Sequence, residues 1–165
     1  MSGILVYSEA EETALGLLTK GRSLAVELNK SLSVALLGKE ANGHEEIYFA
    51  HGATYVYVGN DPALSHFQGS IYAEALNQVV NQAQADIVLI GSTRRGREIA
   101  PRLAQRLSAG CITDAISLTT QGNRLVVERR ALGGNTVSAR IITSPQQVIS
   151  VMPGLYEAKL CLTTT

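Results

Sequence analysis

One segment of the sequence groups residue types that bind anions. The apolar run Ile87 to Ile90 leads into a small, glycine-bounded loop and then into a helix-like pattern up to Leu107. In a doubly wound sheet such a loop presents backbone N–H groups at a helix N-terminus, where phosphates bind. We therefore predict that a phosphate or pyrophosphate contacts this loop, which consists of Gly91, Ser92, Thr93, Arg94, Arg95 and Gly96.

A second interpretation of the same segment needs no ligand. The loop is then a tight strand-to-helix connection, and Glu98 and Arg102 form an i,i+4 ion pair on a solvated helix face. The segment has neither the Lys-Ser/Thr pair of a P-loop nor a G-x-G-x-x-G fingerprint. Further along, Asp114 is predicted to be either a buried polar anchor or a partner for a loop arginine, so both interpretations stay open.

Other residue types that carry chemistry lack suitable neighbours. His44, His51 and His66 have no cysteines or clustered carboxylates at metal-ligand spacing, so we expect solvated or capping histidines. Cys111 has no basic partner nearby in sequence, and no serine lies in a G-x-S-x-G motif. The sequence therefore predicts neither a metal site nor catalytic residues.

The composition limits the class of protein. The chain has 165 residues, of which 45% are hydrophobic, and this length favours one compact domain. Its 14 basic and 14 acidic residues balance, which gives no overall field to attract nucleic acid. The longest apolar runs are about five residues, against roughly 20 for a membrane span. We expect a cytoplasmic protein without membrane insertion.

The elements that position the loop follow a β-α pattern as far as Leu107. Short apolar runs alternate with stretches of helical spacing, which predicts a parallel sheet covered on both faces. Ser8 and Glu11 fit a capping box for the first helix, and Pro101 is expected in the first turn of the helix that follows the loop. The predicted strands are 4–7, 33–37, 55–58 and 87–90.

From Cys111 onward the pattern changes to successive strands. Residues 112–120, 125–130, 137–143 and 147–151 are all strand-like, with no helix between them. The turn sequences Gln121-Gly122-Asn123 and Gly133-Gly134-Asn135 favour an antiparallel extension of meander type. We predict one domain over 1–152, with 153–165 as a linker or docking tail.

The central segment also carries a family resemblance. Gly91-Ser92-Thr93, the run from Gly96 to Ala104, Arg106-Leu107 and Thr113-Asp114 resemble the G-A-T-x-x-G-[KR]-[DE]-L-A-P-R-x-A-x-R-L…T-D pattern in the N-terminal domain of the electron transfer flavoprotein alpha subunit. The similarity extends over essentially the whole chain, from Ile4-Leu5-Val6-Tyr7 to Val151-Met152-Pro153-Gly154.

This resemblance implies a fold, a role and partners. The fold is a three-layer α/β sandwich of the adenine nucleotide alpha-hydrolase-like type with an antiparallel β extension at its C-terminal end. The role is structural and partner-docking: it supports electron transfer through FAD, which another domain holds, and involves no catalysis by this chain. The expected partners are a beta-type subunit and a separate FAD domain, or a second copy in a homodimer. AMP or FAD is the nucleotide that loop 91–96 would contact, and a stand-alone nucleotide-binding module of the universal-stress-protein type is the alternative.

Overall fold

The computed structural model describes residues 2–38 and 41–161. A single eight-stranded sheet, with strand order β3-β2-β1-β4-β8-β5-β6-β7, forms the middle layer. The strands are β1 Gly3–Tyr7, β2 Ser31–Leu37, β3 Tyr55–Gly59, β4 Ala85–Gly91, β5 Gly110–Gln121, β6 Arg124–Ala131, β7 Thr136–Arg140 and β8 Gln147–Val151. The helices are α1 Glu11–Leu28, α2 Glu45–Ala50, α3 Gly69–Ala83 and α4 Arg94–Leu107, with 3₁₀ turns η1 Pro62–Leu64 and η2 Leu132–Gly134.

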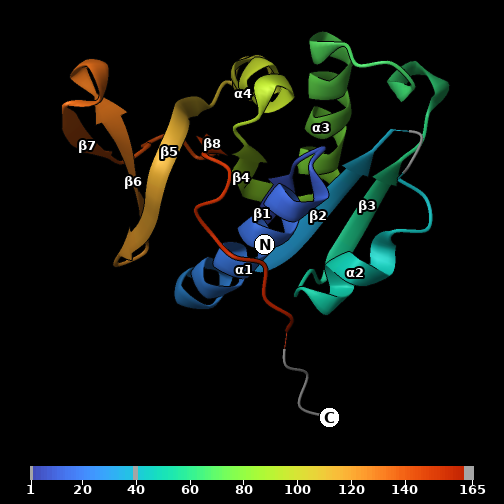
Figure 1. Cartoon of the computed structure of the whole chain (residues 1–165), viewed down its shortest axis with the longest axis horizontal. Helices are drawn as coiled ribbons and strands as arrows, with labels where there is room; N and C mark the ends of the chain where they lie inside the picture. Colours follow the sequence, from blue (N-terminus) through green and yellow to red (C-terminus); the bar gives the residue numbers. More distant parts are fainter. Residues whose placement is uncertain (1, 39–40, 162–165) are drawn as a thin grey trace.

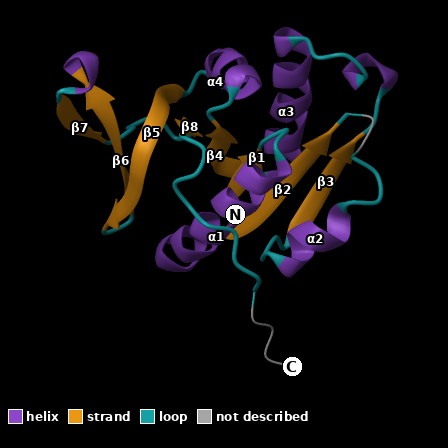
Figure 2. Ribbon diagram, in the orientation of Figure 1, coloured by secondary structure: helices purple, strands orange, loops and turns teal. Residues whose placement is uncertain are grey.

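The sheet separates two hydrophobic cores, which confirms the predicted three-layer α/β class. Alternate residues of β1 point to opposite faces: Ile4 and Val6 pack with α1, whereas Leu5 and Tyr7 pack with α3 and α4. Strands β1 and β4 are buried on both faces, as parallel strands covered by helices must be. Figure 2 shows the sheet between the helices.

The last strand lies where the sequence interpretation did not place it. We predicted residues 147–151 within the antiparallel extension, but β8 enters the core between β4 and β5 and pairs parallel with both. The physical reason is burial on both faces, because Val148 joins one core and Ile149 the other. Strands β5, β6 and β7 do form the predicted antiparallel meander.

This meander, here called the arm, extends beyond the helices. Figure 1 shows β5, β6 and β7 at the left of the molecule, with β7 farthest from the helical layers. One face of the arm joins the α1-side core through Leu118, Leu125 and Val127. Thr120 at the end of β5 also donates a hydrogen bond to Glu27 of α1. The arm is therefore anchored at its base, and among the strands of residues 2–38 and 41–161 its far edge, β7, pairs with β6 alone.

Two predicted helix starts are wrong. Helix α1 begins at Glu11 with Ala10 at the N-cap, and Ser8 accepts a hydrogen bond from the Ala10 N–H instead of capping the helix. Helix α4 begins at Arg94, so Pro101 lies inside it and not in its first turn. A proline there removes one intrahelical hydrogen bond, which the burial of Ile99, Ala100 and Leu103 on the same helix offsets.

The segment after β8 runs along α1. The Tyr156 hydroxyl oxygen accepts a hydrogen bond from the Leu118 N–H of the arm at 3.2 Å, and the Lys159 N–H donates to the Thr19 hydroxyl at 2.9 Å. Gly16 permits this approach, because a β-carbon there would overlap the Tyr156 carbonyl oxygen. Of the predicted tail, residues 162–165 lie outside the described residues, and the boundary at 152/153 stays a prediction.

Candidate functional site

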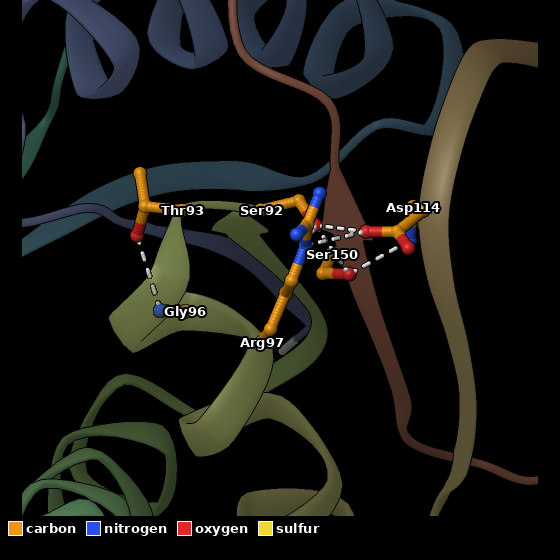
Figure 3. Close-up of polar contacts among 6 residues, drawn as sticks. All are labelled: Ser92, Thr93, Gly96, Arg97, Asp114 and Ser150. Atoms are coloured by element: carbon orange, nitrogen blue, oxygen red, sulfur yellow. Dashed lines mark hydrogen bonds and ion pairs between the residues drawn. The ribbon is translucent and has the colours of Figure 1, made fainter.

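A polar cluster joins the predicted phosphate loop to the base of the arm. We call Ser92, Arg97, Asp114 and Ser150 the Ser92–Asp114 cluster; Figure 3 shows their side chains converging from the β4–α4 loop, α4, β5 and β8. The Ser92 hydroxyl donates a hydrogen bond to the Asp114 carboxylate. The Arg97 Nε lies 3.3 Å from the same carboxylate oxygen and 3.4 Å from the Ser92 hydroxyl.

The backbone at Asp114 explains why this cluster matters to the arm. Asp114 has φ +56°, a left-handed conformation that aspartate tolerates better than most residues. The register of β5 shifts twice here: across Asp114, between Ile112 and Ala115, against β8, and just after it, between Ala115 and Ser117, against β6. Here β5 leaves its parallel partner and enters the antiparallel arm, as bulged strands do when they bend.

Ser150, on strand β8, is the fourth residue of the cluster. Its side chain is fully buried, and its hydroxyl accepts the Asp114 N–H at 2.9 Å. It also lies 3.4 Å from the Ser92 hydroxyl oxygen. Asp114 falls within the register shift of β5 and is not paired with a residue of β6 or β8, so the Ser150 hydroxyl gives its part-buried N–H an acceptor. Sequence reasoning missed Ser150, although a lone polar residue inside the run Val148 to Val151 was the available signal.

Thr93 and the two glycines hold the loop close to the sheet. The Thr93 hydroxyl accepts the Gly96 N–H at 3.1 Å, so Thr93 is the N-cap of α4. A β-carbon on Gly96 would overlap the Gly91 carbonyl oxygen, so only glycine allows this tight approach of helix to strand. The loop is thus stabilised by its own contacts.

The structure brings some of the predicted loop residues together and separates others. Gly91, Ser92 and Gly96 are buried, whereas the Arg94 and Arg95 side chains are exposed. Arg95 lies over the Phe67 ring at 4.9 Å, on the α3 side of the loop. A phosphate would compete with Asp114 for the Ser92 hydroxyl proton and with Thr93 for the Gly96 N–H. A nucleotide contact at residues 91–96 stays a prediction.

Three of the five arginines in the loop and helix α4 have carboxylate partners, which lowers the local positive charge; the five are Arg94, Arg95, Arg97, Arg102 and Arg106. Arg97 pairs with Asp114, and the predicted Glu98–Arg102 pair is present with an N–O distance of 3.6 Å. The Arg106 Nε lies 3.1 Å from a carboxylate oxygen of Glu74 on α3. Asp114 therefore fits the second of the two predicted roles, a partner for an arginine.

The described residues contain no group of three or more histidine, cysteine and acidic side chains that could hold a metal. His51 is buried at the end of α2, with its Nδ1 2.7 Å from the Ile47 carbonyl oxygen. Within ranges 2–38 and 41–161, no helix combines the length and hydropathy of a membrane span.

Comparisons with known proteins identify the family of this chain. A family model described as "Electron transfer flavoprotein domain" matches residues 5–164. The chain belongs to the electron transfer flavoprotein domain family. The resemblance of the central segment is thereby confirmed.

Named relatives point to the alpha subunit. The chain is 33% identical to the "Electron transfer flavoprotein subunit alpha" of Clostridium acetobutylicum and, again at 33%, to that of Megasphaera elsdenii; each comparison covers 94% of this chain and 48% of the relative. It is also 34% identical to the "Acryloyl-CoA reductase electron transfer subunit beta" of Anaerotignum propionicum, over 74% of this chain and 35% of that protein. The chain spans about half the length of the electron transfer flavoprotein alpha subunits it matches.

Proposed function

We propose that this chain is the partner-docking domain of an electron transfer flavoprotein. It binds a beta-type subunit and positions it for electron transfer through FAD, with no catalytic group of its own. The same proposal assigns the flavin to a separate FAD domain and the assembly to the cytoplasm. Family membership and the alpha-subunit relatives support this role, and none of them favours a stand-alone module of the universal-stress-protein type.

The observation that carries the proposal is the exposed arm. Leu132 at its tip is 78% exposed and Val137 on β7 is 55% exposed. Strand β7 is an edge strand, so one side of its backbone lacks a partner within the sheet. An exposed apolar edge is a surface that proteins normally cover. A partner subunit seated against the arm would cover both the apolar side chains and the strand edge.

The Ser92–Asp114 cluster gives the arm a fixed direction. The cluster joins α4, β8 and the bend in β5, so the rigid core determines where β6 and β7 lie. A docking surface that is already oriented loses less conformational entropy on binding than a mobile one. The loop residues that the sequence assigned to a ligand thus have a positioning role in this proposal.

The polar groups of loop 91–96 that could hold a nucleotide phosphate have contacts within the chain. The Ser92 hydroxyl already donates to Asp114, the Gly96 N–H already donates to Thr93, and Arg97 pairs with Asp114. The Ser92 and Arg97 side chains therefore fit an internal contact better than a contact with the phosphate of FAD or AMP. AMP binding here stays a proposal that calorimetry with the purified chain tests.

A binding experiment with matched edge-strand variants tests the docking role. The chain is titrated into a beta-type electron transfer flavoprotein subunit by isothermal calorimetry, with and without a separate FAD domain, and the complex mass is measured by light scattering. Val137→Asp on β7 should weaken binding at least about tenfold, because it places a charge in an apolar contact. Val58→Asp on β3, the opposite edge strand, is the control and should leave binding unchanged.

Three results would count against the proposal. If the Val137→Asp and Val58→Asp proteins bind the beta-type subunit with equal affinity, the arm is not part of the interface. A purified chain that is yellow with stoichiometric flavin would contradict a separate FAD domain. A stable homodimer that buries the arm and excludes the beta-type subunit would replace heteromeric docking with self-association.

A further inference from the structure

The arm is positively charged, although the chain as a whole is neutral. Residues 115–140 hold four of the chain's 14 basic residues and one of its 14 acidic residues. The arm therefore has a net charge of +3, and the rest of the chain has a net charge of −3. A charge asymmetry of this kind favours association with a surface of opposite sign and disfavours a surface of like sign.

Two of the arm's arginines lie on one face of it. Arg129 of β6 is in phase with Leu125 and Val127, so all three side chains point to the α1 side of the sheet. On β7, Ser138 lies directly opposite Arg129, and Arg140 lies opposite Val127, so both share this face. The Arg140 Nε donates a hydrogen bond to the Ser138 hydroxyl at 3.1 Å. We call Arg129, Ser138 and Arg140 the Arg129–Arg140 cluster.

The arginines of this cluster lack a counter-charge. No ion pair joins Arg129 or Arg140 to a carboxylate among residues 2–38 and 41–161. The Arg129 Nε is shielded from solvent and makes no hydrogen bond within that part of the chain. Glu27 of α1, near the base of the same face, accepts a hydrogen bond from Thr120. A guanidinium N–H removed from water without an acceptor is unfavourable, so a carboxylate that reached it would form a strong, charge-assisted hydrogen bond.

The cluster lies where a docked protein would cover it. Arg140 is exposed on β7, the edge strand, and Arg129 and Ser138 are half-buried beside it. We infer that the partner surface that receives the arm is acidic and that its carboxylates pair with Arg129 and Arg140. This inference rests on the proposed docking role and adds the chemistry of the partner. An apolar partner surface would desolvate both guanidiniums without a counter-charge, which is strongly unfavourable.

Calorimetry with a beta-type subunit tests the inference with matched charge-removing variants. Arg129→Gln and Arg140→Gln each remove one charge and keep a polar side chain, and each should weaken binding roughly three- to thirtyfold. Arg124→Gln makes the same charge change at an exposed position on the opposite face of the arm. It is the control, and its affinity should stay within about twofold of wild type.

The salt dependence of association gives a second readout. Raising the salt concentration from about 0.05 M to about 0.5 M should slow association of the wild-type chain at least about fivefold, because salt screens the attraction between the two surfaces. The Arg129→Gln/Arg140→Gln double variant should slow by no more than about twofold over the same range. Arg140 is exposed, so Arg140→Gln keeps the test decisive even where Arg129→Gln impairs folding.

The outcomes separate this inference from the docking role. If Val137→Asp weakens binding but the glutamine variants and added salt do not, the arm docks and the acidic partner surface is wrong. If Arg124→Gln weakens binding as much as Arg140→Gln, net charge and not the cluster is responsible, and the inference is overturned. If Val137→Asp has no effect, the docking role fails and the inference fails with it.

Light scattering on the chain alone tests one other source of the carboxylates. The remainder of the chain has a net charge of −3, so the arm of one copy could meet the body of another. A monomer at all salt concentrations agrees with the inference. A salt-sensitive dimer that Arg140→Gln dissociates would assign the carboxylates to a second copy and overturn it.

Discussion

Substitutions at Asp114 test whether the Ser92–Asp114 cluster holds the bend that directs the arm. Asp114→Ala removes the acceptor of the Ser92 hydroxyl and of Arg97, and it leaves a residue with no local hydrogen bond at φ +56°. Asp114→Asn keeps the size, one acceptor oxygen and the tolerance of a left-handed backbone. The two variants therefore separate the loss of the contacts from the loss of the charge.

The expected losses of unfolding free energy follow from how deeply each contact partner of Asp114 is buried. Ser92 is 2% exposed, so losing its hydrogen bond to a charged acceptor costs about 1.5–3 kcal/mol. The Arg97 and Asp114 side chains are 55% and 40% exposed, so solvent screens their ion pair to at most about 1 kcal/mol. Alanine in a left-handed conformation adds about 1 kcal/mol. Asp114→Ala should thus destabilise the fold by about 3–5 kcal/mol, and Asp114→Asn by about 1 kcal/mol.

Urea unfolding followed by far-UV circular dichroism measures these losses. For a chain of this size each kcal/mol corresponds to roughly 2–4 °C in Tm, which gives a second readout. In a double-mutant cycle, Ser92→Ala and Asp114→Ala should couple by at least about 1 kcal/mol because the two residues share one hydrogen bond. The reasoning is refuted if the two changes add as independent sites do, or if Asp114→Asn destabilises the protein as much as Asp114→Ala.

Three further predictions concern the loop and the core. Gly96→Ala should lower the free energy of unfolding by about 1–3 kcal/mol, since its β-carbon would overlap the Gly91 carbonyl; a urea midpoint unchanged from wild type contradicts this. Thr93→Val should lower the free energy of unfolding by about 1 kcal/mol, because α4 loses its N-cap, and urea unfolding measures this as well. Thr119→Val, at an exposed position in the arm, is the control, and its free energy of unfolding should stay within about 0.5 kcal/mol of wild type. Burial, with a contribution from Glu11, raises the pKa of Tyr48 to about 12. The unfolded tyrosine ionises first, so stability should hold below pH 10 and fall between pH 10 and 12 by up to about 1.4 kcal/mol per pH unit; Tyr48→Phe should show a shallower fall.

The layers of the fold follow from local patterns in the sequence. Continuous apolar runs such as Ile87 to Ile90 predict buried parallel strands, and the structure places this run in β4. The position of β8 could not be predicted in the same way, because strand order depends on contacts far apart in sequence. Residues 147–151 have the apolar pattern of any buried strand. Their parallel pairing follows from their position between β4 and β5, which the local pattern does not predict.

The candidate site, too, could be predicted only in part from the sequence. The sequence indicated that the glycines and hydroxyl groups of loop 91–96 form a tight or ligand-binding loop, but it did not indicate which groups they contact. Thr93 caps its own helix, a local relation that a capping rule finds, whereas the contact of Ser92 with Asp114 spans 22 residues and depends on how β5 bends. The left-handed backbone at Asp114 has no local sequence signal apart from the tolerance of aspartate for that conformation.

Hydrogen–deuterium exchange with a beta-type subunit tests the central claim most directly, because it locates the docking surface on the chain. The docking role predicts that amides of β7 and of the η2 turn become protected when the beta-type subunit is added, while those of β3, the opposite edge strand, exchange as before. Unchanged exchange along β7, with new protection at β3 or nowhere, would contradict the claim that the arm is the docking surface.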